Sequence, residues 1–329
     1  MRILFLGSGP FGAPVLERLA SLGADLVVGT VPGAPRGRHG RPEPTPIGAL
    51  ARDLGLECLE IETLRGARGS ELVARTRSEL AIVCDFRLML GRRFLEALPR
   101  GSWNLHGSIL PRHRGAAPVA RAILAGDEEF GVTLLRMVLP LDAGPIVDIV
   151  RYRPDPGSDA EAIEARLSHL AADLLEKWLP ALAAGSAPVV EQDERAATYA
   201  PKLEKQEGWI DWTRAAPAIE RQVRALRPWP RAFTEWGTSA AAGPAARAER
   251  IFIDRAIAEG DRAPAVAPGD VRAAGADGIR IACGGDGTAT LRALALQRAG
   301  KRSLPAGEFL RGFPLAGGRF LPPRQEQIR

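Results

Sequence analysis

The sequence has few cysteines and no long hydrophobic run. Its three cysteines, Cys58, Cys84 and Cys283, are odd in number, far apart and outside any C-x-x-C pair, which argues against a disulfide framework and a zinc site. No segment approaches the roughly 18 consecutive apolar residues of a membrane span, and a glycine-rich segment at 7–10 interrupts the apolar start before it could act as a signal peptide. These absences predict a cytoplasmic protein with no membrane association and no metal.

The remaining composition is typical of a folded chain with many loops. Aromatic residues make up only 5% of the 329 residues, while 36 Gly and 27 Pro predict frequent turns. The hydrophobic fraction of 46% is too high for a disordered chain. At roughly 150 residues per domain, the length predicts about two domains.

Positive charge is concentrated in the C-terminal part. Residues 201–329 carry 21 Lys and Arg against 14 Asp and Glu, a net charge of +7, whereas residues 1–200 carry 23 against 25, a net charge of −2. Because cationic side chains neutralise phosphates, the basic part favours binding of a polyanion. Since 40 of the 44 basic residues are Arg, a generally arginine-rich composition explains the charge equally well.

The first half of the chain alternates strand-like and helical segments. Apolar runs typical of buried strands occur at residues 2–6, 25–31, 56–61 and 80–84. Thr45-Pro46 supplies an N-cap and a proline at the first position of a helix, and leucines recur at helical spacing between Asp159 and Ala184. The alternation predicts an α/β fold with a doubly wound, mostly parallel sheet, which binds ligands at the carboxyl ends of its strands.

The pattern changes after residue 185. A helix is expected over residues 215–226, followed by short strand-like segments at 251–253, 278–283 and 289–296 between Gly- and Pro-rich turns. Such a series predicts a small, OB-like β-barrel. We therefore expect an N-terminal α/β domain over residues 1–185, a polar linker over 186–207 and a basic C-terminal domain over 208–329.

The segment from Gly7 to Gly12 satisfies the dinucleotide pattern G-x-G-x-x-G after a first strand. That pattern also requires an acidic residue at the end of the second strand to bind the ribose hydroxyl. Here the second strand ends in Gly29-Thr30-Val31. The missing acid disfavours a nicotinamide oxidoreductase, and the segment is interpreted as a tight turn between strand and helix.

Asn104 and His106 carry the strongest chemical signal. Two residues apart on a strand, their side chains project from the same side. A carboxamide can donate to a developing oxyanion, and an imidazole can move protons or stabilise the same charge. A strand expected at 131–137 ends before Asp142, whose carboxylate would orient the imidazole. These residues predict an acyl-transfer site.

The motifs around these residues resemble those of the formyltransferases that use 10-formyl-tetrahydrofolate. The shared pattern is Asn-x-His at 104–106, Leu-Pro-x-x-Arg-Gly-Ala-Ala-Pro at 110–118, Gly-Val-Thr at 131–133 and Leu-Asp-x-Gly at 141–144. The resemblance implies that Asn104, His106 and Asp142 form the catalytic triad. It also implies 10-formyl-tetrahydrofolate as the formyl donor, with no metal.

Motifs in the second half are similar to those of family members that formylate methionyl initiator tRNA. They are Thr-Tyr-Ala-Pro-Lys-Leu at 198–203, Gly-Trp-Ile-Asp-Trp at 208–212, Arg-Ala-Leu-Arg-Pro-Trp-Pro at 224–230 and Gly-Lys-Arg at 300–302. The resemblance therefore implies methionyl initiator tRNA as the acceptor and a monomeric enzyme that supports translation initiation.

The resemblance also assigns binding residues. The expected folate-binding residues are Cys84, Asp85, Phe86, Ser108, Leu110, Pro111 and Gly144. Family members carry small and aromatic residues followed by a glycine where this chain has 84–87, the segment that lines their pterin pocket. The expected tRNA-binding residues are Arg36, Arg38, Arg41, Lys202, Lys301 and Arg302. The first three lie in a Gly- and Pro-rich loop that relatives place against the acceptor stem.

Two alternatives stay open at this point. A formyltransferase acting on a small amine, or a hydrolase of the formyl donor, would use the same three residues but would need neither the basic C-terminal part nor the basic loop. A non-catalytic RNA-binding protein on a formyltransferase scaffold is the alternative of another class, and the charged residues Asp85 and Arg87 are the feature that favours it.

Overall fold

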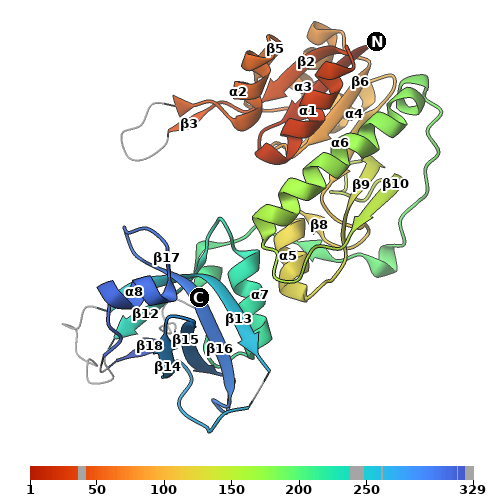
Figure 1. Cartoon of the computed structure of the whole chain (residues 1–329). Coiled ribbons are helices and arrows are strands. Elements are labelled where there is room, and N and C mark those ends of the chain that lie inside the picture. The colour runs from red at the N-terminus through yellow and green to blue at the C-terminus, as the bar shows by residue number, and fades with distance from the viewer. Residues whose placement is uncertain (36–41, 238–247, 261, 317, 323–329) are drawn as a thin grey trace. The chain divides into compact units, whose positions relative to one another are not determined.

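The computed structural model describes residues 1–35, 42–237, 248–260, 262–316 and 318–322. They form two compact units (Figure 1). Unit 1 consists of Met1–Pro118, Glu129–Pro154 and Ile163–Pro201, and unit 2 consists of Val119–Glu128, Asp155–Ala162 and Lys202–Arg329. Within the described ranges, no helix is long and apolar enough to cross a membrane, and no group of three or more His, Cys, Asp or Glu side chains is arranged to hold a metal ion.

Unit 1 is built on a seven-stranded sheet with the order β10-β9-β7-β6-β1-β2-β5. The strands are β1 (Arg2–Gly7), β2 (Asp25–Thr30), β5 (Glu57–Glu60), β6 (Leu80–Cys84), β7 (Ser102–His106), β9 (Phe130–Arg136) and β10 (Ile146–Tyr152). The five strands from β5 to β7 are parallel to their neighbours, and β9 and β10 are added antiparallel at one edge. The predicted mostly parallel sheet is therefore confirmed.

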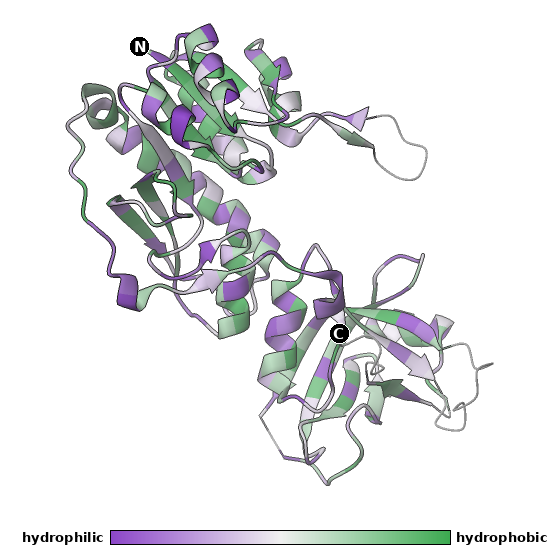
Figure 2. Cartoon of the chain, turned by 180° about the vertical axis from the view of Figure 1, so that it is seen from behind, coloured by the Kyte–Doolittle hydropathy of each residue, from purple (hydrophilic) through white to green (hydrophobic). Residues whose placement is uncertain are grey.

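Successive side chains of β1 point to opposite faces of the sheet, and because the side chains on both faces are apolar, helices cover both faces. Leu4 and Leu6 face a buried cluster that includes residues of α3 (Ala67–Thr76) and α4 (Arg92–Ala97). Phe5 points to the other face, where its ring lies close to Ile47. Each such side chain, when fully buried, contributes about 1.5–3 kcal/mol to the free energy of unfolding. Figure 2 shows the hydrophobic residues concentrated along the strands of unit 1.

The second face is covered by α1 (Ala13–Ser21), α2 (Pro46–Asp53) and α6 (Ala160–Ala184). As predicted, Thr45 caps α2, because its Oγ1 accepts a hydrogen bond from Gly48 N at 3.0 Å. Arg18 of α1 forms ion pairs with Asp173 and Glu176 of α6. These pairs fix the long helix beside α1.

Strand order reverses between β1 and β6, and open α/β sheets generally bind ligands at the carboxyl ends of the strands at such a point. A short 3₁₀ helix, η1 (Pro10–Gly12), follows β1 directly. The backbone N–H groups of Ser8 and Gly9 donate to Asp85 O, at 2.9 and 3.3 Å, and so tie the turn after β1 to the end of β6. The adjacent β7 ends at His106.

Unit 2 contains an antiparallel sheet with the order β14-β15-β16-β13-β12-β18, with β17 paired to β16. The strands are β12 (Ala232–Gly237), β13 (Glu249–Glu259), β14 (Val271–Gly275), β15 (Gly278–Cys283), β16 (Ala289–Arg298), β17 (Leu304–Pro305) and β18 (Arg319–Leu321). The sheet curls so strongly that its two edges approach each other. Phe320 N in the edge strand β18 donates to Gly269 O, just before the other edge strand β14, at 2.9 Å. This curled sheet, a half-barrel, is the small barrel expected from the sequence.

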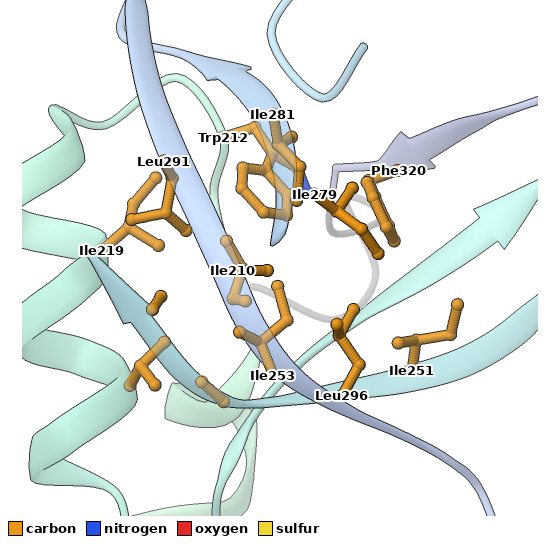
Figure 3. Packing of buried hydrophobic residues seen from close by; sticks show 14 of the residues in the cluster. Ile210, Trp212, Ile219, Ile251, Ile253, Ile279, Ile281, Leu291, Leu296 and Phe320 are labelled. Atoms are coloured by element: carbon orange, nitrogen blue, oxygen red, sulfur yellow. The ribbon is translucent and has the colours of Figure 1, made fainter. Parts of the chain in front are cut away.

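One side of the curled sheet encloses the core of unit 2 (Figure 3). Trp212 lies at its centre, fully buried, and its Nε1–H donates to Thr234 Oγ1 at 3.1 Å. The cluster also contains the residues labelled in Figure 3, which are Ile210, Ile219, Ile251, Ile253, Ile279, Ile281, Leu291, Leu296 and Phe320, together with Trp236 and Phe309. The helices of the unit are α5 (Pro118–Ala125), α7 (Ala216–Ala225) and α8 (Ala306–Gly312).

Short elements complete the two units. β3 (Ala34–Pro35) pairs with β4 (Pro42–Glu43), and β8 (Arg114–Gly115) pairs in parallel with β11 (Tyr199–Ala200). Two further 3₁₀ helices are η2 (Glu194–Ala196) and η3 (Lys205–Gly208). Residues 192–200, expected from their polarity to be part of a linker, hydrogen bond to loops of unit 1 as described below.

Candidate active site

The structure brings the three predicted catalytic residues together. Asn104 and His106 project from the same side of β7, and Asp142 lies in the loop between β9 and β10. Asn104 Nδ2 lies 3.4 Å from Asp142 Oδ1, and His106 Nδ1 lies 3.7 Å from Asp142 Oδ2. The side chains of His106 and Asp142 are only 7% and 6% exposed. One amide, one imidazole and one carboxylate thus meet at a largely buried point.

A backbone contact decides which ring nitrogen of His106 is available for chemistry. His106 Nε2 lies 2.9 Å from His113 O. Because a carbonyl oxygen can only accept, Nε2 carries a hydrogen and donates it. Nδ1 therefore faces Asp142, and at 3.7 Å it is not committed to a direct hydrogen bond. Nδ1 is the nitrogen that can exchange a proton or donate to a negatively charged oxygen.

The loop that presents Asp142 has an unusual backbone. Asp142 has φ +51°, a left-handed conformation that costs a non-glycine residue roughly 1–2 kcal/mol. Its Oδ2 accepts a hydrogen bond from Gly115 N at 2.9 Å. At Gly144 a Cβ atom would overlap Arg136 O, so this position requires glycine. The carboxylate is held by contacts that fix the loop as well as the side chain.

The predicted folate-binding residues after β7 form a hydrogen-bonded turn. Ser108 Oγ donates to Arg112 O at 2.7 Å, while Ser108 O accepts from Thr133 Oγ1 at 2.7 Å. Leu110 N donates to the same Thr133 hydroxyl at 3.1 Å. Ser108 and Leu110 are buried, and Pro111 follows them half-buried. The structure places this turn directly beyond His106.

The predicted folate-binding residues after β6 differ from one another. Cys84 is fully buried, and burial, together with the nearby Asp85 charge, raises the pKa of its thiol well above the usual range. Phe86 packs against the core cluster of unit 1. Asp85 keeps an exposed surface, but protein atoms surround its carboxyl; the reduced hydration raises its pKa, opposed by Arg87 and by a hydrogen bond from Phe11 N–H. Asp85 and Arg87 thus both keep exposed surface, while the carboxyl group of Asp85 is enclosed by protein atoms.

The glycine-rich turn after β1 is closely packed. A Cβ atom on Gly9 would overlap the carboxylate of Asp85. At Gly12 it would lie 3.1 Å from Cys84 O, tighter than ordinary contact. The glycines therefore allow close packing of the turn against β6, in agreement with its interpretation as a tight strand-to-helix connection.

The predicted tRNA-binding residues fall into two groups. Lys202, Lys301 and Arg302 are exposed, the last two in the turn between β16 and β17. Their charges contrast with those of Arg280 and Arg292, which both pair with Glu259, at 3.0 and 3.2 Å. The other predicted residues, Arg36, Arg38 and Arg41, lie outside the described residues.

Sequence reasoning missed two residues that contact the site from residues 192–200. Gln192 Nε2 donates to Asp142 O at 2.8 Å and to Gly144 O at 2.7 Å. Thr198 Oγ1 accepts from His113 N at 2.9 Å. For Gln192 the sequence signal was the polarity of this segment, which is also typical of a solvated linker. Thr198 stood in the motif at 198–203, but that motif gave it no contact with this site.

The chain belongs to the formyl transferase family. The family model "Formyl transferase" matches residues 1–179, and the model "Formyl transferase, C-terminal domain" matches residues 202–314. The two matches correspond to the α/β and curled-sheet parts of the fold.

Relatives of known activity point more narrowly, to methionyl-tRNA formyltransferases. The chain is 39% identical over 320 residues to the methionyl-tRNA formyltransferase of Cereibacter sphaeroides, covering 97% of this chain and 98% of that protein. It is 37% identical over 323 residues to the methionyl-tRNA formyltransferase of Nitrosococcus oceani, covering 97% and 95%.

Solved structures share the fold at lower identity. WlaRD, a sugar 3N-formyltransferase crystallised in the presence of dTDP and 5-N-formyl-THF, is 15% identical with a TM-score of 0.63, covering 92% of this chain and 99% of that one. HypX from Aquifex aeolicus in complex with tetrahydrofolic acid is 17% identical with a TM-score of 0.62 and covers 95% of this chain. This chain spans about half of HypX, 48% of its length.

Proposed function

We propose that this protein transfers the formyl group of 10-formyl-tetrahydrofolate to the amino group of methionyl initiator tRNA and so supports translation initiation. The observation that carries the proposal is the convergence of Asn104, His106 and Asp142 beside the carboxyl ends of the central strands. The full-length similarity to methionyl-tRNA formyltransferases supports the choice of acceptor. The folate compounds in the crystals of WlaRD and HypX support the choice of donor.

In the proposed reaction, the methionyl amine forms a bond to the formyl carbon and the bond from that carbon to the folate nitrogen breaks. Asn104 Nδ2–H and the Nδ1–H of protonated His106 donate to the oxyanion of the tetrahedral intermediate. Asp142 faces Nδ1 of His106 and accepts the amine proton through water. A proton then passes to the folate nitrogen, which leaves as the neutral amine.

The donor site is proposed at the carboxyl ends of β6 and β7. Ser108, Leu110 and Pro111 would line it on one side, and the segment 84–86 on the other. Asp85 would offer a carboxylate acceptor for N–H groups of a pterin, while Cys84, being fully buried, would contribute only backbone groups. Gly144 would contribute by its close packing under the Asp142 loop.

The acceptor is proposed to bind through phosphate contacts to unit 2 and to the basic loop after β2. We assign the chemistry to residues 1–185 and tRNA binding mainly to residues 208–329, whose positive charge supports this role. Lys202, Lys301 and Arg302 are exposed and so accessible to phosphates. A single chain holds every residue of the proposed triad, so a monomer is sufficient.

The test is identification of the product with purified protein. The protein is incubated with 10-formyl-tetrahydrofolate and charged initiator tRNA, and the esterified amino acid is analysed for formylmethionine. The proposal expects formylmethionyl-tRNA only when both substrates are present. Release of formate without charged tRNA, or formylation of a small amine in preference to it, would contradict the proposal.

A further inference from the structure

Residues 192–200, here named the strap, contact both loops that hold the proposed catalytic groups. The strap is the last segment of unit 1, since Pro201 ends that unit and Lys202 resumes unit 2. Its β11 pairs with β8, and Ala117 N donates to Ala200 O at 3.2 Å. These bonds fix the strap against the loop between β7 and α5.

Both the nitrogen and the oxygen of the Gln192 side-chain amide form hydrogen bonds. Its Nε2 donates to Asp142 O and Gly144 O, and its Oε1 accepts from Arg114 Nε and Nη2 at 3.1 and 2.8 Å. The opposite orientation of the amide is excluded, because carbonyls only accept and a guanidinium only donates. Arg114 is itself 2% exposed and pairs with Glu194 of the strap. Gln192 thus connects the Asp142 loop to a buried, anchored arginine.

Thr198 holds the peptide groups on both sides of His113. Its Oγ1 accepts from His113 N, and its backbone O accepts from Arg114 N at 2.9 Å. The second bond fixes the peptide group that contains His113 O, the acceptor of His106 Nε2–H. His113 has φ +59°, so this loop, like that of Asp142, is in a left-handed conformation. Such conformations persist where surrounding contacts fix them.

We propose that Gln192 and Thr198 are positioning residues for the formyl transfer, an inference that rests on the proposed function. Gln192 holds the backbone that presents Asp142. The Thr198 hydroxyl holds His113 N, and so fixes the loop whose His113 carbonyl accepts from His106 Nε2–H. Loss of either set of bonds lets a loop relax and moves a reacting group away from its partner. The chemical step then slows, while binding of tRNA through its phosphates is unchanged.

Two variants of Gln192 separate its contacts. Gln192→Glu keeps the acceptor for Arg114 but places a carboxylate oxygen against the carbonyls of Asp142 and Gly144, and Gln192→Met removes both contacts at similar volume. Each is expected to lower kcat by about 10- to 100-fold, with KM for tRNA nearly unchanged. The matched control is Arg195→Gln in the same strap, since Arg195 is exposed and its guanidinium pairs with Asp193. A Gln192→Glu enzyme with the kcat of the wild type would overturn the role of Gln192.

Thr198 is tested by a conservative pair of variants and by a spectroscopic signal. Thr198→Val removes the hydroxyl at constant shape, and Thr198→Ser restores it. In ¹⁵N NMR spectra of the imidazole rings, the wild type is expected to show His106 protonated at Nε2, a signal that weakens in Thr198→Val and returns in Thr198→Ser together with kcat. Thr198→Val with an unaltered His106 signal and unaltered kcat would overturn the role of Thr198.

These measurements also separate the inference from the proposed function. If the wild type and Arg195→Gln both fail to form formylmethionyl-tRNA, the proposed function fails, while the NMR signal of His106 still reports whether Thr198 positions the ring. If both are active and the Gln192 and Thr198 variants match them, only the inference fails. Thermal unfolding of each variant identifies any loss of folding, in which case the NMR comparison of Thr198→Val and Thr198→Ser decides the role of the strap.

Discussion

Unit 1 and unit 2 use charged side chains in opposite ways. In unit 1 the carboxylate of Asp142 is largely buried and receives hydrogen bonds from named groups on two other segments. In unit 2 arginines lie along the curled sheet, several paired with carboxylates, and Lys202, Lys301 and Arg302 are exposed. For the proposed function, this difference makes the reaction in unit 1 depend on where a few atoms lie, and tRNA binding by unit 2 depend on how many charges it presents.

The largest expected effect is in the triad of unit 1. Asn104→Ala and His106→Ala each remove a proposed oxyanion donor, so kcat should fall by about 100-fold or more while tRNA affinity stays nearly intact. Steady-state formylation assays give kcat, and filter binding gives the affinity. A His106→Ala enzyme that works at the full rate would refute the mechanism.

Asp142→Asn should have a smaller effect on the same step. The amide keeps the shape of the side chain but carries no charge to stabilise protonated His106, so we expect kcat to fall roughly 10- to 100-fold. The dependence of kcat on pH should also change, because the amide cannot accept the amine proton that the carboxylate is proposed to take. An unchanged pH–rate profile would remove Asp142 from its assigned role.

Arg38 tests tRNA recognition apart from chemistry. If its side chain contacts a phosphate or an unpaired base of the acceptor end, Arg38→Ala should weaken productive tRNA engagement by roughly 1–3 kcal/mol. Removal of a phosphate contact should also make the log–log salt dependence of kcat/KM shallower by about one unit. Thermal unfolding and folate binding serve as controls. Identical salt curves for variant and wild type would show that this arginine has no part in binding.

The smallest expected effect is at the exposed turn of unit 2. Lys301→Gln with Arg302→Gln should raise KM for tRNA modestly and make the salt slope shallower by about 0.9 for each phosphate that the turn no longer neutralises, with kcat unchanged. Arg311→Gln, in the exposed part of α8, changes the net charge without altering this turn. If this single charge outside the turn accounted for as much of the slope as both residues of the turn, net charge and not this turn would account for the binding.

The fold could be predicted where local patterns repeat. Apolar runs marked β1, β2 and β6, and Thr45-Pro46 marked the start of α2. The sequence did not predict β10, whose residues are half-buried and interrupted by Asp148 and Arg151. The side-chain partners of Asp148 lie far away in the sequence, since its carboxylate accepts hydrogen bonds from Lys177 and Trp178 of α6. Such compensation between distant segments has no local signature.

The candidate site, like the fold, could be predicted from the sequence only in part. Asn104 and His106 could be paired from the period of two along one strand, and Asp142 could be placed with them because it follows the strand expected at 131–137. Gln192 could not be found, because its partners Asp142 and Gly144 lie 50 and 48 residues earlier in the chain. Thr198 contacts a residue 85 positions away. A polar segment that holds a site in place by hydrogen bonds has the same composition as a polar segment that only connects two domains.

The division of labour between the units is tested most directly by one salt series. The values of kcat and KM for methionyl initiator tRNA are measured across it for the wild type, Asn104→Ala and the Lys301→Gln, Arg302→Gln double variant. We expect Asn104→Ala to lower kcat at every salt concentration and to leave the salt slope of KM unchanged. We expect the double variant to change that slope and to leave kcat unchanged. A salt slope altered by Asn104→Ala, or a kcat lowered by the double variant, would contradict this division of labour.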